Sequence, residues 1–326
     1  MKRRVFLGAV GAVFAVPRSG RAQSAATPVI GFLNSASPVT YARPLQAFNR
    51  GLEEAGYVDG KNVAIEYRWG ENEYGRLPAL AADLVQRQVT MIVATTGSAA
   101  LAAKAATTTI PIVFETGADP LRLGLVASLS RPGGNVTGVS QLTTGLAPKD
   151  LEILHELLPM ARVMALLVNP ANAAFAEIEA GDVRAAARTL GLELFVLTAS
   201  SAGDFDGVFA ALGRSGAGGL VIGGDAFFST RLDQLAALAL RHRVPAIYIR
   251  REFTAAGGLL SYGNDLADTY RQVGLYTGRI LKGEKPADLP VQQATKVELI
   301  INLNTVNALG LSVPTTLLSR ADEVIE

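Results

Sequence analysis

Hydrophobic residues along this chain follow two alternating patterns. Short apolar runs rich in β-branched residues are typical of buried strands, and longer stretches with apolar residues three and four positions apart are typical of helices. In the first half, the predicted strands are 29–34, 63–69, 91–94 and 110–114, and the predicted helices are 41–56, 77–88 and the Ala-rich stretch after Ser98. Regular alternation of strand and helix predicts a parallel sheet with helices on both faces.

The same order of elements begins again at Val163. The predicted strands are now 164–169, 192–198, 218–225 and 244–249, and the predicted helices are 175–190, 205–213 and 230–242. Landmark residues repeat at a nearly constant spacing, with 135 positions between Asn34 and Asn169 and 134 between Pro111 and Pro245. Similar α/β halves also arise by coincidence, but a constant offset over a whole half favours two equivalent lobes.

The last part of the chain is too short for a third lobe. Its predicted helix (265–282), extended segment (286–303) and helical piece after Pro314 are expected to complete the two lobes. We therefore predict an α/β fold with two doubly wound parallel-sheet lobes, joined by a hinge that the chain crosses several times. The predicted first lobe comprises residues 23–142 plus 263–290, and the second comprises 143–262 plus 291–326.

The segment that follows strand 110–114 contains two local motifs. Asp119-Pro120 has the form of a helix N-cap followed by proline at the first helical position, which predicts a helix over 120–130. The Gly-rich sequence RPGGNVTG (131–138) matches neither GxGxxG nor a phosphate-binding loop, because no GK[ST] follows it. We interpret it as a turn that leads into the hinge.

The N-terminal 22 residues have the organisation of a signal peptide. A basic start (MKRR) precedes the apolar run 5–16, and small residues before Gln23 provide a cleavage site near Ala22. Arg3-Arg4 followed by Phe6-Leu7 resembles the twin-arginine export signal; general secretion and a simple amphipathic helix are the alternatives. We therefore expect a periplasmic protein.

Composition narrows the classes of partner. The first 22 residues carry five basic and no acidic side chains, so without them the formal net charge is −4 instead of +1, which argues against nucleic acid as a partner. The chain has no cysteine, so it has neither a disulfide nor a lipidated N-terminal Cys. It also has no apolar run of about 18 residues. We expect a monomer that is not membrane-anchored.

Ligands of open parallel sheets bind beyond the carboxyl ends of the strands. These ends are rich in hydroxyl and amide side chains in the first lobe and carry an acid, aromatic residues and the pair Arg250-Arg251 in the second. If the lobes face each other, the ends line one cleft. The candidate ligand-binding residues are Asn34, Ser35, Thr95, Thr96, Ser98, Thr116, Asn169, Asp225 and Phe227.

The chemistry of these corners suggests a charged ligand. Free backbone N–H groups at the start of the helix after Thr96 favour an anion, with Ser98 as a further donor, and Asp225 is suited to an ammonium group. Local structural roles are the alternatives: an N-cap for Ser98 and Asp225, and core packing for Phe227 and Phe228. Asn34 and Asn169 have turn stabilisation as their alternative.

Catalytic and metal-binding patterns are missing from the sequence. Neither His155 nor His242 follows a predicted strand, and there is no Cys, no HExxH and no GxSxG. We therefore expect no enzymatic activity, no metal and no cofactor.

Several segments together resemble the ABC-transporter substrate-binding proteins of the tryptophan/tyrosine-binding type. They are IGFLNSASP, GLEEAGYVDGKNVAIEYRW, TTGSAAL, ADPLRLGLVASLSRPGGNVTGVS and the C-terminal stretch that starts at GRILKGEKPADLP. The resemblance implies a type I periplasmic binding protein fold, with two lobes, three crossovers and a ligand enclosed by closure. It also implies that the corner 95–98 holds the α-carboxylate of an amino acid and Asp225 its amine, although few aromatic residues lie at the corners.

The expected function is thus capture of a small carboxylate-bearing ligand, such as an aromatic or other amino acid, for delivery to the membrane permease and ATPase of an ABC importer. The alternative is a sensing subunit that presents the bound solute to a membrane receptor. An enzyme on the same fold and a cytoplasmic repressor are weaker alternatives, the latter because the export signal stands where a DNA-binding headpiece would be.

Overall fold

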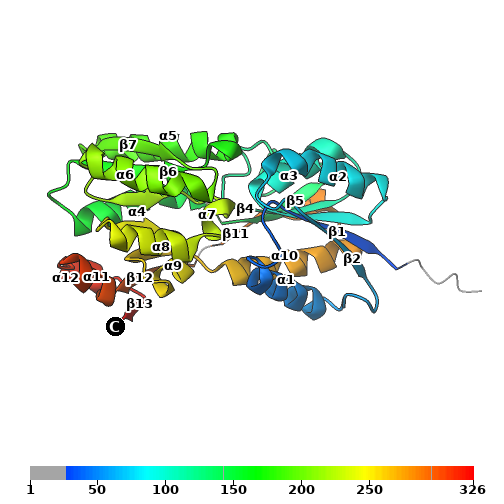
Figure 1. The fold of residues 1–326 in the computed structure, drawn as a ribbon. Coiled ribbons are helices and arrows are strands. Elements are labelled where there is room, and N and C mark those ends of the chain that lie inside the picture. Colours follow the sequence, from blue (N-terminus) through cyan, green and yellow to red (C-terminus); the bar gives the residue numbers. More distant parts are fainter. Residues whose placement is uncertain (1–26, 142, 295) are drawn as a thin grey trace, which may run out of the picture.

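The computed structural model describes residues 27–141, 143–294 and 296–326. The predicted signal peptide and its cleavage site lie outside these residues. A six-stranded and a seven-stranded sheet lie side by side, each with helices on both faces (Figure 1). This architecture confirms the predicted fold class of two α/β lobes. Within the described ranges, no helix has the length and apolar character needed to cross a membrane.

The first lobe is built on a parallel sheet with the strand order β11-β5-β4-β3-β1-β2. Alternate strand residues face opposite ways, so Ile30 and Phe32 pack against α1 and α10, and Leu33 packs against α2 and α3. Its elements are β1 (Val29–Asn34), α1 (Ala42–Glu54), β2 (Ala64–Trp69), η1 (Tyr74–Arg76), α2 (Leu77–Gln86), β3 (Met91–Thr95), α3 (Gly97–Ala106), β4 (Ile112–Thr116), β5 (Val136–Ser140), α10 (Leu266–Leu281), η4 (Pro286–Asp288) and β11 (Gln292–Gln293).

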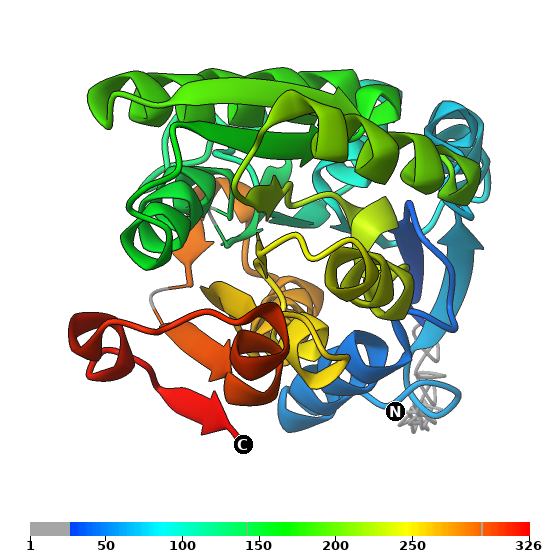
Figure 2. The ribbon, with the colours of Figure 1, turned by 60° about the vertical axis from the view of Figure 1, so that its left-hand side comes forward.

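The second lobe has the strand order β13-β12-β10-β9-β8-β6-β7, with α4 and α5 on one face and α6 and α8 on the other. Only the β10–β12 pair is antiparallel among its described strands, and the C-terminal β13 lies beside β12 (Figure 2). Its elements are α4 (Thr143–Leu157), β6 (Val163–Val168), η2 (Pro170–Asn172), α5 (Ala173–Thr189), β7 (Glu193–Thr198), η3 (Ala202–Asp204), α6 (Phe205–Ser215), β8 (Leu220–Ile222), α7 (Ala226–Ser229), α8 (Leu232–Arg241), β9 (Ala246–Tyr248), α9 (Arg251–Ala255), β10 (Leu260–Asn264), β12 (Val297–Asn302), α11 (Leu303–Leu309), α12 (Thr315–Leu318) and β13 (Glu323–Ile325).

The chain passes between the two sheets three times: from β5 to α4, from β10 to α10, and from β11 to β12. The expected division after residue 142 falls in the first of these connections. The expected division after residue 262 falls inside β10, and the one after residue 290 falls just before β11. The strand assignments therefore put the second and third crossings a few residues later along the chain.

The segment after β4 differs from its prediction. Residues 120–130 form turns instead of a helix, and Asp119 Oδ1 accepts a hydrogen bond from the backbone N–H of Leu121 (2.8 Å), as in an Asx turn. Gly124 has a φ of +66°, which ends the first turn before a helix can continue. The predicted turn 131–138 ends in β5, a strand that its polar and Gly-containing sequence concealed.

Helix α10 is fixed to the first lobe by a close contact with α1, and the two helices lie side by side in both ribbon views (Figures 1 and 2). A Cβ atom on Gly51 would lie 1.9 Å from the carbonyl O of Arg271, and one on Gly274 would lie 2.2 Å from the carbonyl O of Phe48. The backbones therefore approach so closely that only glycine fits at these two positions. This contact holds the return of the chain from the second lobe.

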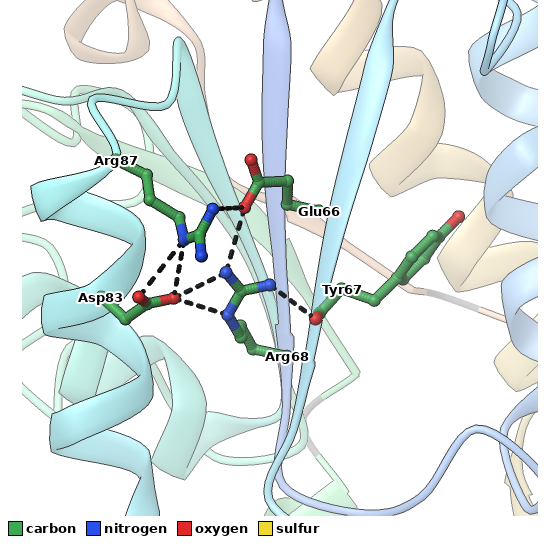
Figure 3. Close-up of polar contacts among 5 residues, drawn as sticks. All are labelled: Glu66, Tyr67, Arg68, Asp83 and Arg87. Atoms are coloured by element: carbon green, nitrogen blue, oxygen red, sulfur yellow. Dashed lines mark hydrogen bonds and ion pairs between the residues drawn. The ribbon is translucent and has the colours of Figure 1, made fainter.

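Charged side chains cover the outer edge strand β2. Arg68 lies between two acids: its Nε and Nη2 contact Asp83 Oδ2 at 2.7 and 2.6 Å, and Nη2 contacts Glu66 Oε2 at 3.0 Å (Figure 3). Arg87, the C-cap of α2, contacts the same two carboxylates. Hydrogen bonding to Arg68 lowers the pKa of the Asp83 carboxyl below its ordinary value. Such a charged edge disfavours pairing with a strand of another molecule.

Gly51→Ala is expected to lower the free energy of unfolding by about 2–4 kcal/mol, because α1 must move away from α10 to admit the methyl group. Chemical denaturation measures this. The matched control is Gly181→Ala in α5, where a Cβ meets nothing within 4 Å. The control should be neutral or more stable by up to about 1 kcal/mol. Equal stabilities of the two variants would contradict the close-contact explanation.

Candidate functional site

A small cavity lies between the two lobes. Its volume is about 30 Å³, which is space for one or two water molecules, whereas sites for small organic ligands occupy about 300–1,000 Å³. A ligand can therefore enter only if the lobes separate. The lining residues are Tyr41, Thr96, Gly97, Ser98, Glu115 and Gly117 from the first lobe, Thr143 at the first crossing, and Asn172, Phe175, Gly224, Ala226, Ser229 and Arg250 from the second lobe.

The corner between β3 and α3 contributes Thr96, Gly97 and Ser98 to this lining. Thr96 is the N-cap of α3, and its Oγ1 accepts a hydrogen bond from the backbone N–H of Ala99 (3.3 Å). The Ser98 Oγ lies 3.5 Å from Thr96 Oγ1. Ser98 is therefore not the N-cap, and it lines the cavity beside the start of the helix.

Four other predicted residues of the first lobe lie behind the lining. Asn34 donates from Nδ2 to the carbonyl O of Thr95 (2.7 Å) and to Thr95 Oγ1 (2.9 Å), and its Oδ1 accepts from the backbone N–H of Ala36. Thr116 Oγ1 accepts from the backbone N–H of Ala118, and Ser35 is fully buried. The Asn34, Thr95 and Thr116 side chains hold the strand ends through these hydrogen bonds, the Ser35 hydroxyl has no partner among the described residues, and none of the four borders the cavity.

The Asp225 carboxylate is already hydrogen-bonded to neighbouring groups of the protein. Asp225 is the N-cap of α7, and Asn169 is the N-cap of η2. The Asp225 carboxylate accepts hydrogen bonds from Tyr74 Oη (2.7 Å), Asn169 Nδ2 (2.8 Å), the backbone N–H of Phe227 (2.9 Å) and Asn172 Nδ2 (2.8 Å). The bond from Tyr74 joins the lobes directly. Asp225 would have to release one of these donors to bind an ammonium group.

Phe227 packs in the core of the second lobe. Its ring stacks on Phe205 with a centroid distance of 5.7 Å and also contacts Phe228, and it is absent from the cavity lining. Both Phe227 and Phe228 therefore pack in the core, which was the alternative to ligand contact.

Three residues that were not among the site predictions form a buried chain from one lobe to the other. Gln141 Nε2 donates to Glu115 Oε1 (3.0 Å), and Arg250 Nη1 donates to Gln141 Oε1 (3.0 Å). Glu115 is the fourth residue of β4, and Arg250 follows β9. Glu115 follows the predicted strand 110–114 and Arg250 follows the predicted strand 244–249, so both lie where ligand-binding residues are expected.

Burial changes the ionisation of several acids around the cleft. Desolvation raises the pKa of Glu115 to about 7, against the opposing effects of the Arg250 charge and the Gln141 hydrogen bond. Behind the Gly223-Gly224 turn, desolvation raises the pKa of Glu179 to about 8, although its Oε1 accepts from the Gly224 N–H (2.9 Å). Desolvation and the Glu179 charge also raise the pKa of Asp150.

These acids should make stability fall as pH rises. Each keeps its proton in the folded state at pH values where the unfolded chain has already lost it, so between about pH 5 and 8 the folded state binds more protons. We expect the melting temperature of the ligand-free protein to fall across this range, and Glu179→Gln to reduce the fall. Glu177→Gln, an exposed position on the same helix, is the control. A fall that Glu179→Gln leaves unchanged would contradict the assignment.

The described part of the chain has no cluster of three or more His, Cys, Asp or Glu side chains that could hold a metal ion. The groups that line the cavity and could contact a ligand are hydroxyl, amide, carboxyl and guanidinium groups, together with the aromatic rings of Tyr41 and Phe175.

Known proteins share both the sequence and this architecture. The chain is 27% identical over 267 residues to the tyrosine-binding protein of Clostridioides difficile (strain R20291), covering 82% of this chain and 76% of the relative. A conserved domain protein from Vibrio cholerae has a similar structure, with a TM-score of 0.83, 26% identity and coverage of 91% of this chain and 99% of the other.

A third similar structure is an ABC domain from Streptococcus pneumoniae in complex with L-Trp. Its TM-score is 0.82 at 24% identity, and the match covers 92% of this chain and all of the other. At this identity the likeness supports the fold alone.

Residues 38–325 match the family model described as ABC transporter substrate binding protein. The match confirms the resemblance inferred from the sequence, and also the expectation that the chain binds a solute and is not an enzyme. Taken with the two lobes and the cavity between them, it shows that the chain belongs to the family of ABC transporter substrate-binding proteins.

Proposed function

We propose that this protein is the periplasmic receptor of an ABC importer and that it binds a small carboxylate-bearing ligand, an aromatic amino acid in the first instance, in the cavity between its lobes. It would deliver this ligand to the permease and ATPase subunits of the transporter. The observation that carries the proposal is the cavity between the lobes, to which both lobes contribute polar side chains.

The similarity to a tyrosine-binding protein and to a structure in complex with L-Trp supports an aromatic amino acid. The geometry supports it in two ways. The N-terminal end of α3, with the hydroxyls of Thr96 and Ser98, offers donors to a carboxylate. A neighbouring hollow of about 150 Å³ shares Tyr41, Ser229 and Arg250 with the cavity and has apolar walls that include Pro44 and Leu232. This hollow offers space for the apolar part of a ligand.

Binding would proceed by hinge motion of the lobes. Only three crossings connect the sheets, and the ligand would replace part of the contact that the lobes now make with each other. A ligand that binds only the folded protein raises its melting temperature by mass action. At about 100 times the Kd, the expected rise for a chain of this size is about 5 °C.

A thermal-shift and calorimetry panel tests the proposal. It contains the twenty amino acids, aromatic carboxylic acids without an amine, amides and sugars. We expect L-Trp or L-Tyr to raise the melting temperature and to bind with a 1:1 stoichiometry. Shifts confined to sugars or to amides would contradict the proposal, since neither carries a carboxylate.

Thr96→Val combined with Ser98→Ala should weaken binding of the best amino acid about 10- to 100-fold, because two hydroxyl donors to a charged group are lost. Loss of the Thr96 N-cap should also lower the free energy of unfolding of the ligand-free protein by about 1 kcal/mol, so affinities are compared at a temperature where the variant is folded. Thr109→Val combined with Ser130→Ala is the matched control, since both residues are exposed and lie outside the cavity lining. Equal affinities of the two double variants in calorimetry would exclude a role of this corner in binding.

A further inference from the structure

Arg250 has an incompletely satisfied charge. Its side chain is 9% exposed and borders the cavity, its Nη1 donates to Gln141 Oε1 (3.0 Å), and its Nε has no hydrogen-bond partner among the described residues. A buried guanidinium is costly unless hydrogen bonds and an anion balance it, and the nearby Glu115 carboxyl, whose pKa burial raises to about 7, balances it only in part. Arg250 borders the space that a ligand must enter, and its Nε is shielded from solvent in this arrangement.

Glu115 is the acidic residue of the cavity lining, and it reaches this space from the opposite lobe. It is 5% exposed and accepts a hydrogen bond from Gln141 Nε2 (3.0 Å) through Oε1. Asp225, the acid that follows β8, already accepts four hydrogen bonds and does not line the cavity. A positively charged group inside the cavity would therefore meet the carboxyl of Glu115.

The side-chain amide of Gln141 lies between Arg250 and Glu115 and is hydrogen-bonded to both. The amide must direct its carbonyl to Arg250, which only donates, and its NH₂ to Glu115, which accepts as the carboxylate. The Gln141 amide thus places its acceptor oxygen at Arg250 and its donor nitrogen at Glu115. An α-amino acid presents the same order on two adjacent carbons, with a carboxylate for Arg250 and an ammonium for Glu115.

We propose that Arg250 and Glu115 are the specificity-determining pair of the cavity, binding the carboxylate and the ammonium of an α-amino acid, and that Gln141 positions both. This inference rests on the proposed function and names the groups that select the ligand. The carboxylate would then contact Arg250 from the second lobe as well as the Thr96 and Ser98 hydroxyls from the first, and an analogue with one charge would leave either Arg250 or Glu115 unpaired.

The first test uses the unmodified protein and single-charge analogues. Calorimetry compares L-Trp with indole-3-propionate, which lacks the ammonium, and with tryptamine, which lacks the carboxylate. L-Tyr is compared with 3-(4-hydroxyphenyl)propionate and tyramine in the same way. We expect each analogue to bind at least about 100-fold more weakly than its amino acid, since each leaves one buried charge unpaired. An amino acid other than these two that emerges from the panel is compared with its own des-amino and decarboxylated analogues.

The second test uses variants. Arg250→Gln should weaken binding of the amino acid about 100-fold and abolish the preference over the amine analogue, while Arg250→Lys restores part of the affinity. Glu115→Gln should abolish the preference over the carboxylic acid analogue. The matched control is Arg251→Gln: Arg251 is the next residue, is half exposed, and pairs with Glu323 on the surface (2.8 Å). Melting temperatures of the ligand-free variants check that each one folds.

The outcomes separate this inference from the function on which it rests. If the protein binds an amino acid, but Arg250→Gln binds it as Arg251→Gln does, the inference is wrong and the receptor function stands. The same holds if only the carboxylic acids without an amine bind. If no carboxylate-bearing compound binds, both are wrong.

Discussion

The buried guanidinium of Arg250 lies where the two lobes meet, and its charge must be balanced there because water scarcely reaches it. In the ligand-free arrangement the balance is incomplete: one hydrogen bond to Gln141, a carboxyl on Glu115 that burial keeps partly protonated near neutral pH, and a free Nε. A carboxylate from a ligand would complete it. This unsatisfied charge and the small volume between the lobes are the two observations on which the proposed opening of the lobes and closure on a charged ligand rest.

The surrounding structure suits such a motion. Each lobe has its own sheet and core, and α10 is joined to α1 so closely that the return of the chain into the first lobe is rigid. The direct contacts between the lobes are few by comparison. They include the bond from Tyr74 to Asp225 and two exposed ion pairs, Arg43–Glu252 and Arg122–Asp182. Exposed ion pairs each contribute about 0–1 kcal/mol, so separating the lobes costs little compared with unfolding either one.

The sequence predicts most of the fold, because its hydrophobic periodicity is regular. The predicted strand 29–34 matches β1, and the helix 77–88 matches α2 to within two residues. The failures have local causes. β5 was missed because VTGVS is short and half polar, and its glycine is explained only by the neighbouring strand: a Cβ on Gly138 would lie 2.1 Å from the carbonyl O of Phe114. The helix over 120–130 was predicted from its start alone, without regard to Gly124.

The sequence predicts where the candidate site lies, but it predicts only some of the residues that line it. The strand-end rule led to the corners that now line the cavity, including Thr96 and Ser98. It could not tell which side chains at a corner turn inward. Asp225 follows β8 as expected, yet it caps α7, and Phe227 enters the core instead of the cleft. Arg250 and Glu115 also follow predicted strands, but their link through Gln141 is a result of tertiary packing, which no spacing along the chain reveals.

The most direct test of this account is a crystal structure of the protein with its amino-acid ligand bound. We expect the ligand between the lobes, with its carboxylate within hydrogen-bond distance of the Arg250 guanidinium and its ammonium against the Glu115 carboxyl. A ligand bound elsewhere, or one in the cleft whose charged groups contact neither side chain, would contradict it.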